Sequence, residues 1–134
     1  MPKLKVFLVA CVLAAAAALP AAAAELGTQK NTERSVIVAV TPQNLSEDGK
    51  SWDFKIVYDT HSQELSDDVV KSAILLDSVG GRFVPLAWEG AGPGGHHREG
   101  VLRFQPLTSS PKQIELQIRR PGESAPRSFR WQLN

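Results

Sequence analysis

The segment WDFKIVYD, residues 52–59, decides the fold of this chain. Large apolar side chains recur at every second position, and charged residues occupy most of the positions between them. A period of two is typical of a β-strand that buries one face and exposes the other. The segment therefore predicts a strand that places Trp52, Phe54, Ile56 and Tyr58 in a hydrophobic core.

Six further short apolar runs are separated by turn residues in the spacing of an all-β protein. They are residues 36–40, 70–76, 83–88, 101–105, 114–118 and 129–133. The run at 83–88 is expected at a sheet edge, because Pro85 has no amide hydrogen to donate to a neighbouring strand. Seven strands and no helix predict an antiparallel β-sandwich of the immunoglobulin or fibronectin-III type, with Trp52 and Trp131 in its core.

The 134-residue chain divides into three predicted parts. Residues 1–24 combine a short basic start, an apolar stretch and an Ala-rich end, which is typical of a secretory signal peptide. Residues 25–34 are polar and lack periodicity, so we expect a flexible leader there. Residues 35–134 are expected to form the β-sandwich domain. Cleavage of the signal predicts a periplasmic or secreted protein.

Two alternatives for the N-terminal segment remain open. Leu8-Val9-Ala10-Cys11 is similar to a lipidation site, although it follows Lys5 closely. Residues 6–24 also approach the roughly 20 apolar residues that span a bilayer, which would leave an uncleaved anchor. Cleavage is favoured because the stretch is mostly Ala and contains Pro20. It removes the only Cys and the only Met, so the mature domain is expected to fold without a disulfide.

The charge balance excludes some partners. The formal net charge of the chain is +1, and removal of Lys3 and Lys5 with the signal changes it to −1. Neither sign dominates, and no basic stripe with interleaved aromatic residues is present, so nucleic acid is not an expected partner. We expect a monomer that has no membrane contact after signal cleavage.

The three histidines lie in two predicted loops, at His61 and at His96-His97. If every strand reverses along the sandwich axis, the loops after the second, fourth and sixth strands emerge at one end. His61 follows the second strand, His96 and His97 follow the fourth, and residues 120–126 follow the sixth. The sequence therefore predicts that all three histidines gather at one end of the sandwich, where such folds usually carry function.

The sharpest hypothesis for this arrangement is a metal site. Imidazole is the commonest protein ligand for transition metals, and two or three imidazoles with a carboxylate suit Cu(II), Zn(II) or Ni(II). The candidate ligands are His61, His96, His97, Asp59 and Glu99. Adjacent histidines on a strand point to opposite faces, so His96 and His97 share an ion only if Gly94 and Gly95 curl the backbone. The preferred prediction is a non-enzymatic exported binding domain holding Cu(II) or Zn(II).

Three other interpretations remain open. The Gly-Gly-His-His stretch also suits a purely structural turn in which Arg98 pairs with Asp59 or Glu99. The same loops, or the edge strand bearing Pro85, suit contact with a partner protein of the cell envelope. A hydrolase is the weakest alternative: Ser62 lies beside His61, but the chain has no G-x-S-x-G elbow, and neighbouring residues seldom form a working triad.

Four segments together resemble a group of small secreted prokaryotic proteins. They are DTHS (residues 59–62), PLAW (85–88), GGHHREG (94–100) and the pattern R-x-F-x-W (127–131). The resemblance covers most of the predicted mature chain. It implies export and assigns no chemistry to particular residues.

Overall fold

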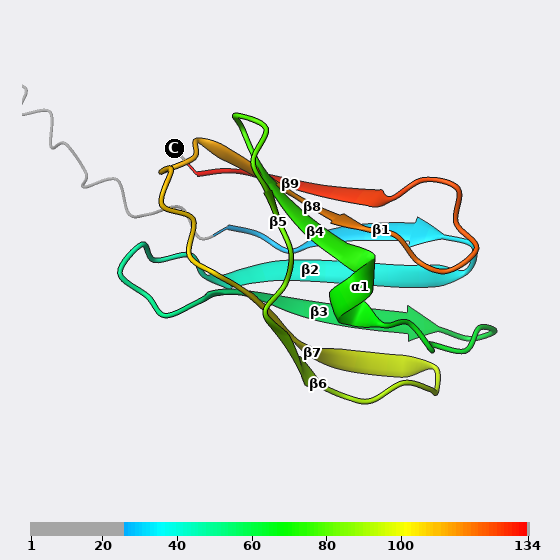
Figure 1. The fold of residues 1–134 in the computed structure, drawn as a ribbon. Coiled ribbons are helices and arrows are strands. Elements are labelled where there is room, and N and C mark those ends of the chain that lie inside the picture. The colour runs from blue at the N-terminus through cyan, green and yellow to red at the C-terminus, as the bar shows by residue number, and fades with distance from the viewer. Residues whose placement is uncertain (1–25, 134) are drawn as a thin grey trace, which may run out of the picture.

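The computed structural model describes residues 26–133, which form two antiparallel β-sheets packed face to face (Figure 1). This confirms the predicted all-β sandwich. The predicted signal peptide, residues 1–24 with Cys11, lies outside the described residues. Within residues 26–133, no helix has the length and apolar character needed to cross a membrane.

Within residues 26–133 the two sheets contain nine strands, and one short helix lies on one of the connections between the sheets. In spatial order, the five-stranded sheet consists of β1 (Gln29–Glu33), β2 (Val36–Asn44), β3 (Trp52–Thr60), β7 (His97–Phe104) and β6 (Ala87–Gly90). The four-stranded sheet consists of β5 (Arg82–Phe83), β4 (Ala73–Asp77), β8 (Gln113–Ile118) and β9 (Arg127–Gln132). Helix α1 (Val69–Ser72) precedes β4, and its first turn is capped by the Asp68 side chain.

The core follows the alternation seen in residues 52–59. Trp52, Phe54, Ile56 and Tyr58 of β3 are all buried. Phe54 packs edge to face on Phe104 of its own sheet and contacts Trp131 of the opposite sheet, with ring centroids 5.7 and 5.8 Å apart. Burial of Trp52 and Trp131 confirms the predicted core, which lies between the sheets as expected for a sandwich.

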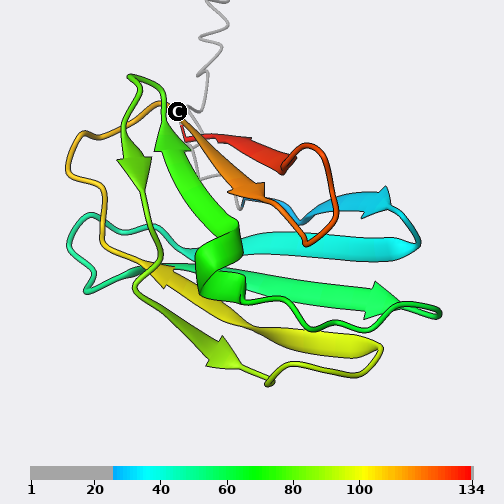
Figure 2. The same ribbon diagram turned by 45° about the vertical axis from the view of Figure 1, so that its right-hand side comes forward.

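Three boundary predictions were wrong. Residues 70–76 begin in α1, and residues 83–88 divide between β5 and β6. The chain continues from β5 into β6 without reversing, so it passes from one sheet to the other around Pro85 (Figure 2). Strand β7 begins at His97, four residues before the predicted start at Val101.

The predicted flexible leader was also wrong, because residues 29–33 form edge strand β1 and pair with β2. Side-chain contacts with β9 hold this strand. Arg127 donates to the carbonyls of Asn31, Glu33 and Val36 at 3.1, 2.9 and 2.8 Å. The Gln29 side chain bonds the backbone of Arg130. Edge strands β1 and β9 belong to different sheets and share no backbone hydrogen bonds, so side-chain contacts join these two sheet edges.

Four loops gather at one end of the sandwich, on the right in Figure 1. We call this the loop end, formed by residues 34–35, 61–68, 91–96 and 119–126. The Thr60 amide donates to the His96 carbonyl at 2.9 Å, and Arg120 forms two bonds to the Asp67 carboxylate at 2.9 and 3.0 Å. The predicted convergence of the loops is confirmed. The predicted fourth strand is divided into β5 and β6, but both run in the same direction, so the loop that follows β6 still emerges at the loop end.

Trp131→Ala should lower the free energy of unfolding by about 3–5 kcal/mol, because it leaves a large cavity between the sheets. Denaturant unfolding measures the change. Val84→Ala is the exposed control: Val84 is 74% exposed, and its truncation to Ala should change stability by less than about 0.5 kcal/mol. Equal effects of the two substitutions would contradict the packing.

Arg127→Met should destabilise the protein by about 3–5 kcal/mol, because it leaves the buried Glu123 carboxylate without its partner. The Arg127 side chain is 0% exposed and that of Glu123 is 3% exposed. Arg130→Met provides the matched comparison, since Arg130 is 65% exposed and its pair with Glu115 should contribute less than about 1 kcal/mol. Thermal unfolding of both variants would test the difference.

Candidate functional site

The antiparallel register places one row of side chains across the outer face of the five-stranded sheet, near the loop end. Thr32, Ile37, Asp59 and His97 stand opposite one another on β1, β2, β3 and β7. Their chain neighbours Val36, Tyr58 and Arg98 are buried. Because successive side chains of a strand point to opposite faces, the row is turned toward solvent.

Asp59, His97 and Glu99 form a contiguous group, which we call the Asp–His–Glu row. Nδ1 of His97 lies 2.5 Å from Oδ1 of Asp59, and Nε2 lies 3.3 Å from Oε2 of Glu99. The side chains are 57%, 49% and 54% exposed for His97, Asp59 and Glu99. Glu99 shares a face with His97 because the two lie two positions apart on one strand.

The carboxylates raise the pKa of His97 above its ordinary value of 6.5. The main cause is the hydrogen bond that the ring donates to Asp59, followed by the negative charge of Asp59 and the hydrogen bond to Glu99. Both interactions favour the imidazolium form. When the ring is neutral, the short contact with Asp59 retains the proton on Nδ1, so the lone pair of Nε2 faces Glu99.

The other two histidines occupy different positions. His61 is exposed and lines a hollow in the outer face together with Asp59, Ile37 and Thr60. His96 is also exposed, and its backbone carbonyl, rather than its ring, bonds Thr60. Within residues 26–133, no group of three or more His, Cys, Asp or Glu side chains is arranged so that all of them could hold one metal ion. The structure therefore joins Asp59, His97 and Glu99, places His61 beside Asp59, and leaves His96 apart.

The structural-turn interpretation was wrong about Arg98. Its side chain points inward, and Asp59 and Glu99 bind His97 instead. Arg98 donates to the carbonyls of Ala91, Asp67 and Leu65 at 2.9, 2.6 and 3.4 Å. Asp59 also contacts His97 of the neighbouring strand, and not the adjacent Ser62-His61 pair considered for a hydrolase.

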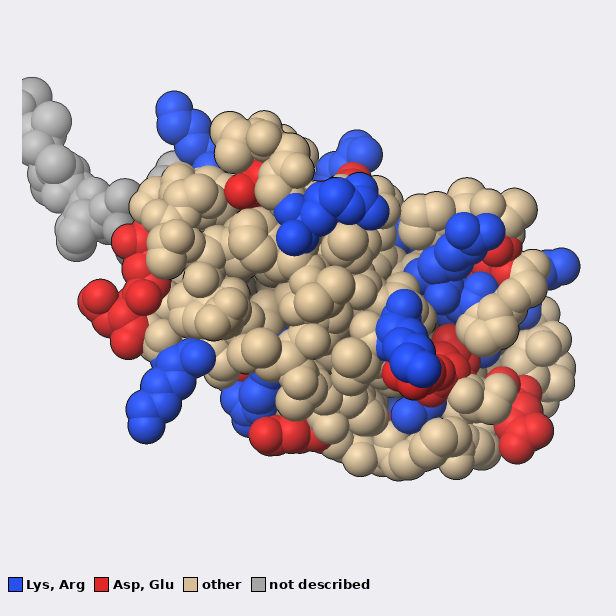
Figure 3. All heavy atoms as spheres, in the orientation of Figure 1, with Lys and Arg blue, Asp and Glu red and all other residues tan. Residues whose placement is uncertain are grey.

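Charged side chains inside the loop end are features that the sequence interpretation missed. Arg98, Arg120, Arg127, Asp67 and Glu123 are all buried there. The Arg127 guanidinium holds the pKa of Glu123 below its usual range. Burial, with a further contribution from the Asp67 charge, raises the pKa of Tyr58 well above its ordinary value. Figure 3 shows the outer charges around this interior, where acidic and basic side chains interleave at the right-hand end.

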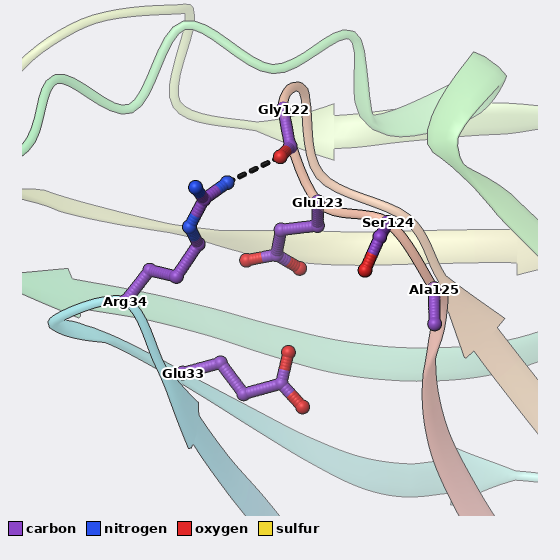
Figure 4. Close-up of a pocket in the computed structure, with 6 residues that line it drawn as sticks. All are labelled: Glu33, Arg34, Gly122, Glu123, Ser124 and Ala125. Atoms are coloured by element: carbon purple, nitrogen blue, oxygen red, sulfur yellow. Dashed lines mark hydrogen bonds between the residues drawn. The ribbon is translucent and has the colours of Figure 1, made fainter.

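A second hollow lies between the β1–β2 turn and the β8–β9 loop (Figure 4). Arg34 crosses it and donates to the Gly122 carbonyl, while Glu33 and Glu123 extend into it. Gly122 has φ +80°, a conformation that favours glycine. Glu123 is already paired with Arg127 at 2.6 Å, so these contacts fasten the turn to the loop.

Comparisons with protein-family models, curated proteins and solved structures found no match for this chain.

Asp59→Asn should lower the pKa of His97, because it removes the interaction that raises it most. Nuclear magnetic resonance titration of the His97 ring measures this pKa. The stabilisation from the pair should be complete below pH 6.5 and lost as the pH rises through the higher pKa of the folded protein. Asp68→Asn removes an exposed carboxylate elsewhere at the loop end and should leave the pKa of His97 unchanged. An identical His97 pKa in wild type and Asp59→Asn would contradict the assigned contact.

Proposed function

We propose that this protein is an exported, non-enzymatic binding domain that holds a Cu(II) or Zn(II) ion at His97 and Glu99. Asp59 orients the imidazole from the opposite strand. Export is supported by the signal-like residues 1–24, and the metal by the geometry of the Asp–His–Glu row.

The separation of 3.3 Å between Nε2 of His97 and Oε2 of Glu99 is the observation that carries this proposal. It is long for a charge-assisted hydrogen bond, which is usually about 2.7–2.9 Å. A tetrahedral zinc ion with ordinary bond lengths separates a nitrogen and an oxygen ligand by about 3.4 Å. The two atoms therefore already have nearly the spacing that two ligands of one ion require.

Asp59 supplies the outer support that metal-binding histidines usually have. A ligating imidazole commonly donates its second ring N–H to a carboxylate, which fixes the tautomer and raises the basicity of the ligand nitrogen. The bond between Asp59 and Nδ1 leaves Nε2 as the ligating atom. Of the two adjacent histidines, this support favours His97 as the ligand.

His61 is the best candidate for a third protein ligand. It lines the same hollow as Asp59 and lies on the loop that directly follows β3. A movement of this exposed loop would bring its ring toward the Asp–His–Glu row, and water would complete the coordination. Nitrogen and carboxylate oxygen ligands suit Zn(II) and Cu(II).

Calorimetric titration of the purified protein with Zn(II) and Cu(II) at neutral pH should show one site of micromolar affinity. His97→Ala and Glu99→Gln should each weaken binding at least about tenfold, and Asp59→Asn by about tenfold. His61→Ala should weaken it less. Affinity should fall as the pH drops through the raised pKa of His97, because a proton and the metal compete for Nε2.

His96→Ala is the matched control, because it removes an adjacent imidazole that does not contact the Asp–His–Glu row. Binding should be unchanged in this variant. A flat titration of the wild-type protein would refute the metal proposal, as would equal losses in His96→Ala and His97→Ala.

A protein-interaction module is the second candidate function. Val79, Val84 and Leu86 are 81%, 74% and 57% exposed, and they flank the short edge strand β5 and the crossing at Pro85. Exposed apolar side chains beside a sheet edge favour contact with another protein. This candidate takes first place if no metal binds.

A further inference from the structure

Arg98 carries a buried charge without an ionic partner. Its residue is 3% exposed, and its hydrogen bonds go to three backbone carbonyls. No ion pair joins it to a carboxylate in the described part of the chain, although Arg120 pairs with Asp67 and Arg127 with Glu123. Three buried guanidinium groups thus face two buried carboxylates, which leaves one positive charge in excess.

This excess charge is unusual because a buried ion is normally paired. The carbonyl bonds explain how Arg98 fastens the loops at 65–67 and 91, but they do not neutralise it. They use Nε and Nη1 only. Nη2 donates to no described residue, and Arg98 is one of the residues that line an adjacent hollow, so this nitrogen is the one left to bind an anion.

A hollow of about 240 Å³ lies beside Arg98 on the inner side of β7, and we call it the Arg98 hollow. Its apolar wall includes Trp88, Pro93 and Val70. The guanidinium carbon of Arg98 lies 5.7 Å from the centre of the Trp88 ring. The volume is below the usual range of drug-sized sites, so it suits a smaller group.

Two glycines position the Trp88 ring. A Cβ atom on Gly90 or Gly100 would lie 3.0 or 2.7 Å from Cζ2 of Trp88. These residues stand opposite each other on β6 and β7, so their missing side chains leave space for the ring. The indole Nε1 donates to the Ala91 carbonyl at 3.0 Å, which fixes the ring beside the charge.

We propose that the Arg98 hollow binds a carboxylate attached to an apolar or aromatic group. Nη2 of Arg98 donates to the carboxylate, and the apolar part packs on Trp88, Pro93 and Val70. This site is separate from the Asp–His–Glu row, because Arg98 points inward and its neighbours His97 and Glu99 point outward. A small free acid and the C-terminal residue of a peptide share this chemistry.

The carboxylate of Asp68 at the rim gives the proposal a directional test. It accepts a hydrogen bond from the Lys71 amide at 3.1 Å as the cap of α1, and it repels a bound anion. Asn caps a helix as well as Asp does, so Asp68→Asn removes the charge and retains the cap. Asp67 exerts less repulsion because Arg120 pairs with it.

The probe is N-acetyl-phenylalanine, followed by the nuclear magnetic resonance signal of the Trp88 indole N–H, which Trp88→Phe identifies. We expect a saturable shift with this acid and no shift with N-acetyl-phenylalaninamide. Arg98→Gln should abolish binding. Asp68→Asn should tighten it about threefold, the size expected for one like charge near a partly solvated site.

Asp48→Asn is the matched control, since Asp48 is an exposed acid in the loop between β2 and β3, outside the Arg98 hollow. It should leave the affinity unchanged. Equal shifts with acid and amide, absence of saturation, or weaker binding in Asp68→Asn would overturn the proposal. If Arg98→Gln fails to fold, the change in probe affinity in Asp68→Asn still tests the proposal.

A second probe distinguishes the two sources of the carboxylate. If N-acetyl-Gly-Gly-Phe with a free C-terminus binds more tightly than N-acetyl-phenylalanine, a peptide terminus is the supported ligand. Equal affinity supports a small acid. Both outcomes require the same Arg98 contact and therefore support the site.

Discussion

The antiparallel register between β3 and β7 controls the chemistry of this molecule. It places Asp59 opposite His97 on the outer face and Tyr58 opposite Arg98 on the inner face. A shift of β7 by one residue would exchange its two faces, which would bury the imidazole and expose the guanidinium. If β3 were the strand that shifted, Phe54 and Ile56 would instead leave the core. The hydrophobic alternation of residues 52–59 therefore positions both proposed sites, although no apolar residue of that segment belongs to either.

The apolar alternation positions the strands, and the buried arginines then join the loops between them. Arg127 ties β1 and the start of β2 to the β8–β9 loop, and Arg120 ties that loop to Asp67. Arg98 extends the connection to the glycine-rich loop before β7. Removing one member of such a pair leaves a buried charge uncompensated, whereas exposed pairs contribute little. A few hydrogen bonds and ion pairs of buried arginines thus hold the loop end together. They fix the backbone that carries the outward-facing Asp59, His97 and Glu99.

The sequence predicted the parts of the fold that depend on apolar periodicity and missed those that depend on long-range polar contacts. The two-sheet sandwich, the core positions of Trp52 and Trp131, and the convergence of the loops were all correct. Strand β1 was missed because its edge is fastened by Arg127 and Gln29 contacts across more than 90 positions of the chain. The inward direction of Arg98 was missed because residues 97–100 read as a polar loop. Once β7 begins at His97, alternation alone separates Arg98 from His97 and Glu99.

Asp59 acts on His97 in two opposing ways, and their balance determines how the proposed metal site would behave. Its hydrogen bond raises the basicity of the imidazole, which strengthens a bond from Nε2 to a metal ion. The same interaction raises the pKa and so strengthens competition by the proton. At the proposed site Glu99 would favour the metal, because a divalent ion would bond both Nε2 and the carboxylate. A proton on Nε2 gains a long hydrogen bond of 3.3 Å and the attraction of the Glu99 charge. Selectivity of the proposed site for a metal over a proton would therefore depend on the spacing between His97 and Glu99 as well as on the basicity of the ring.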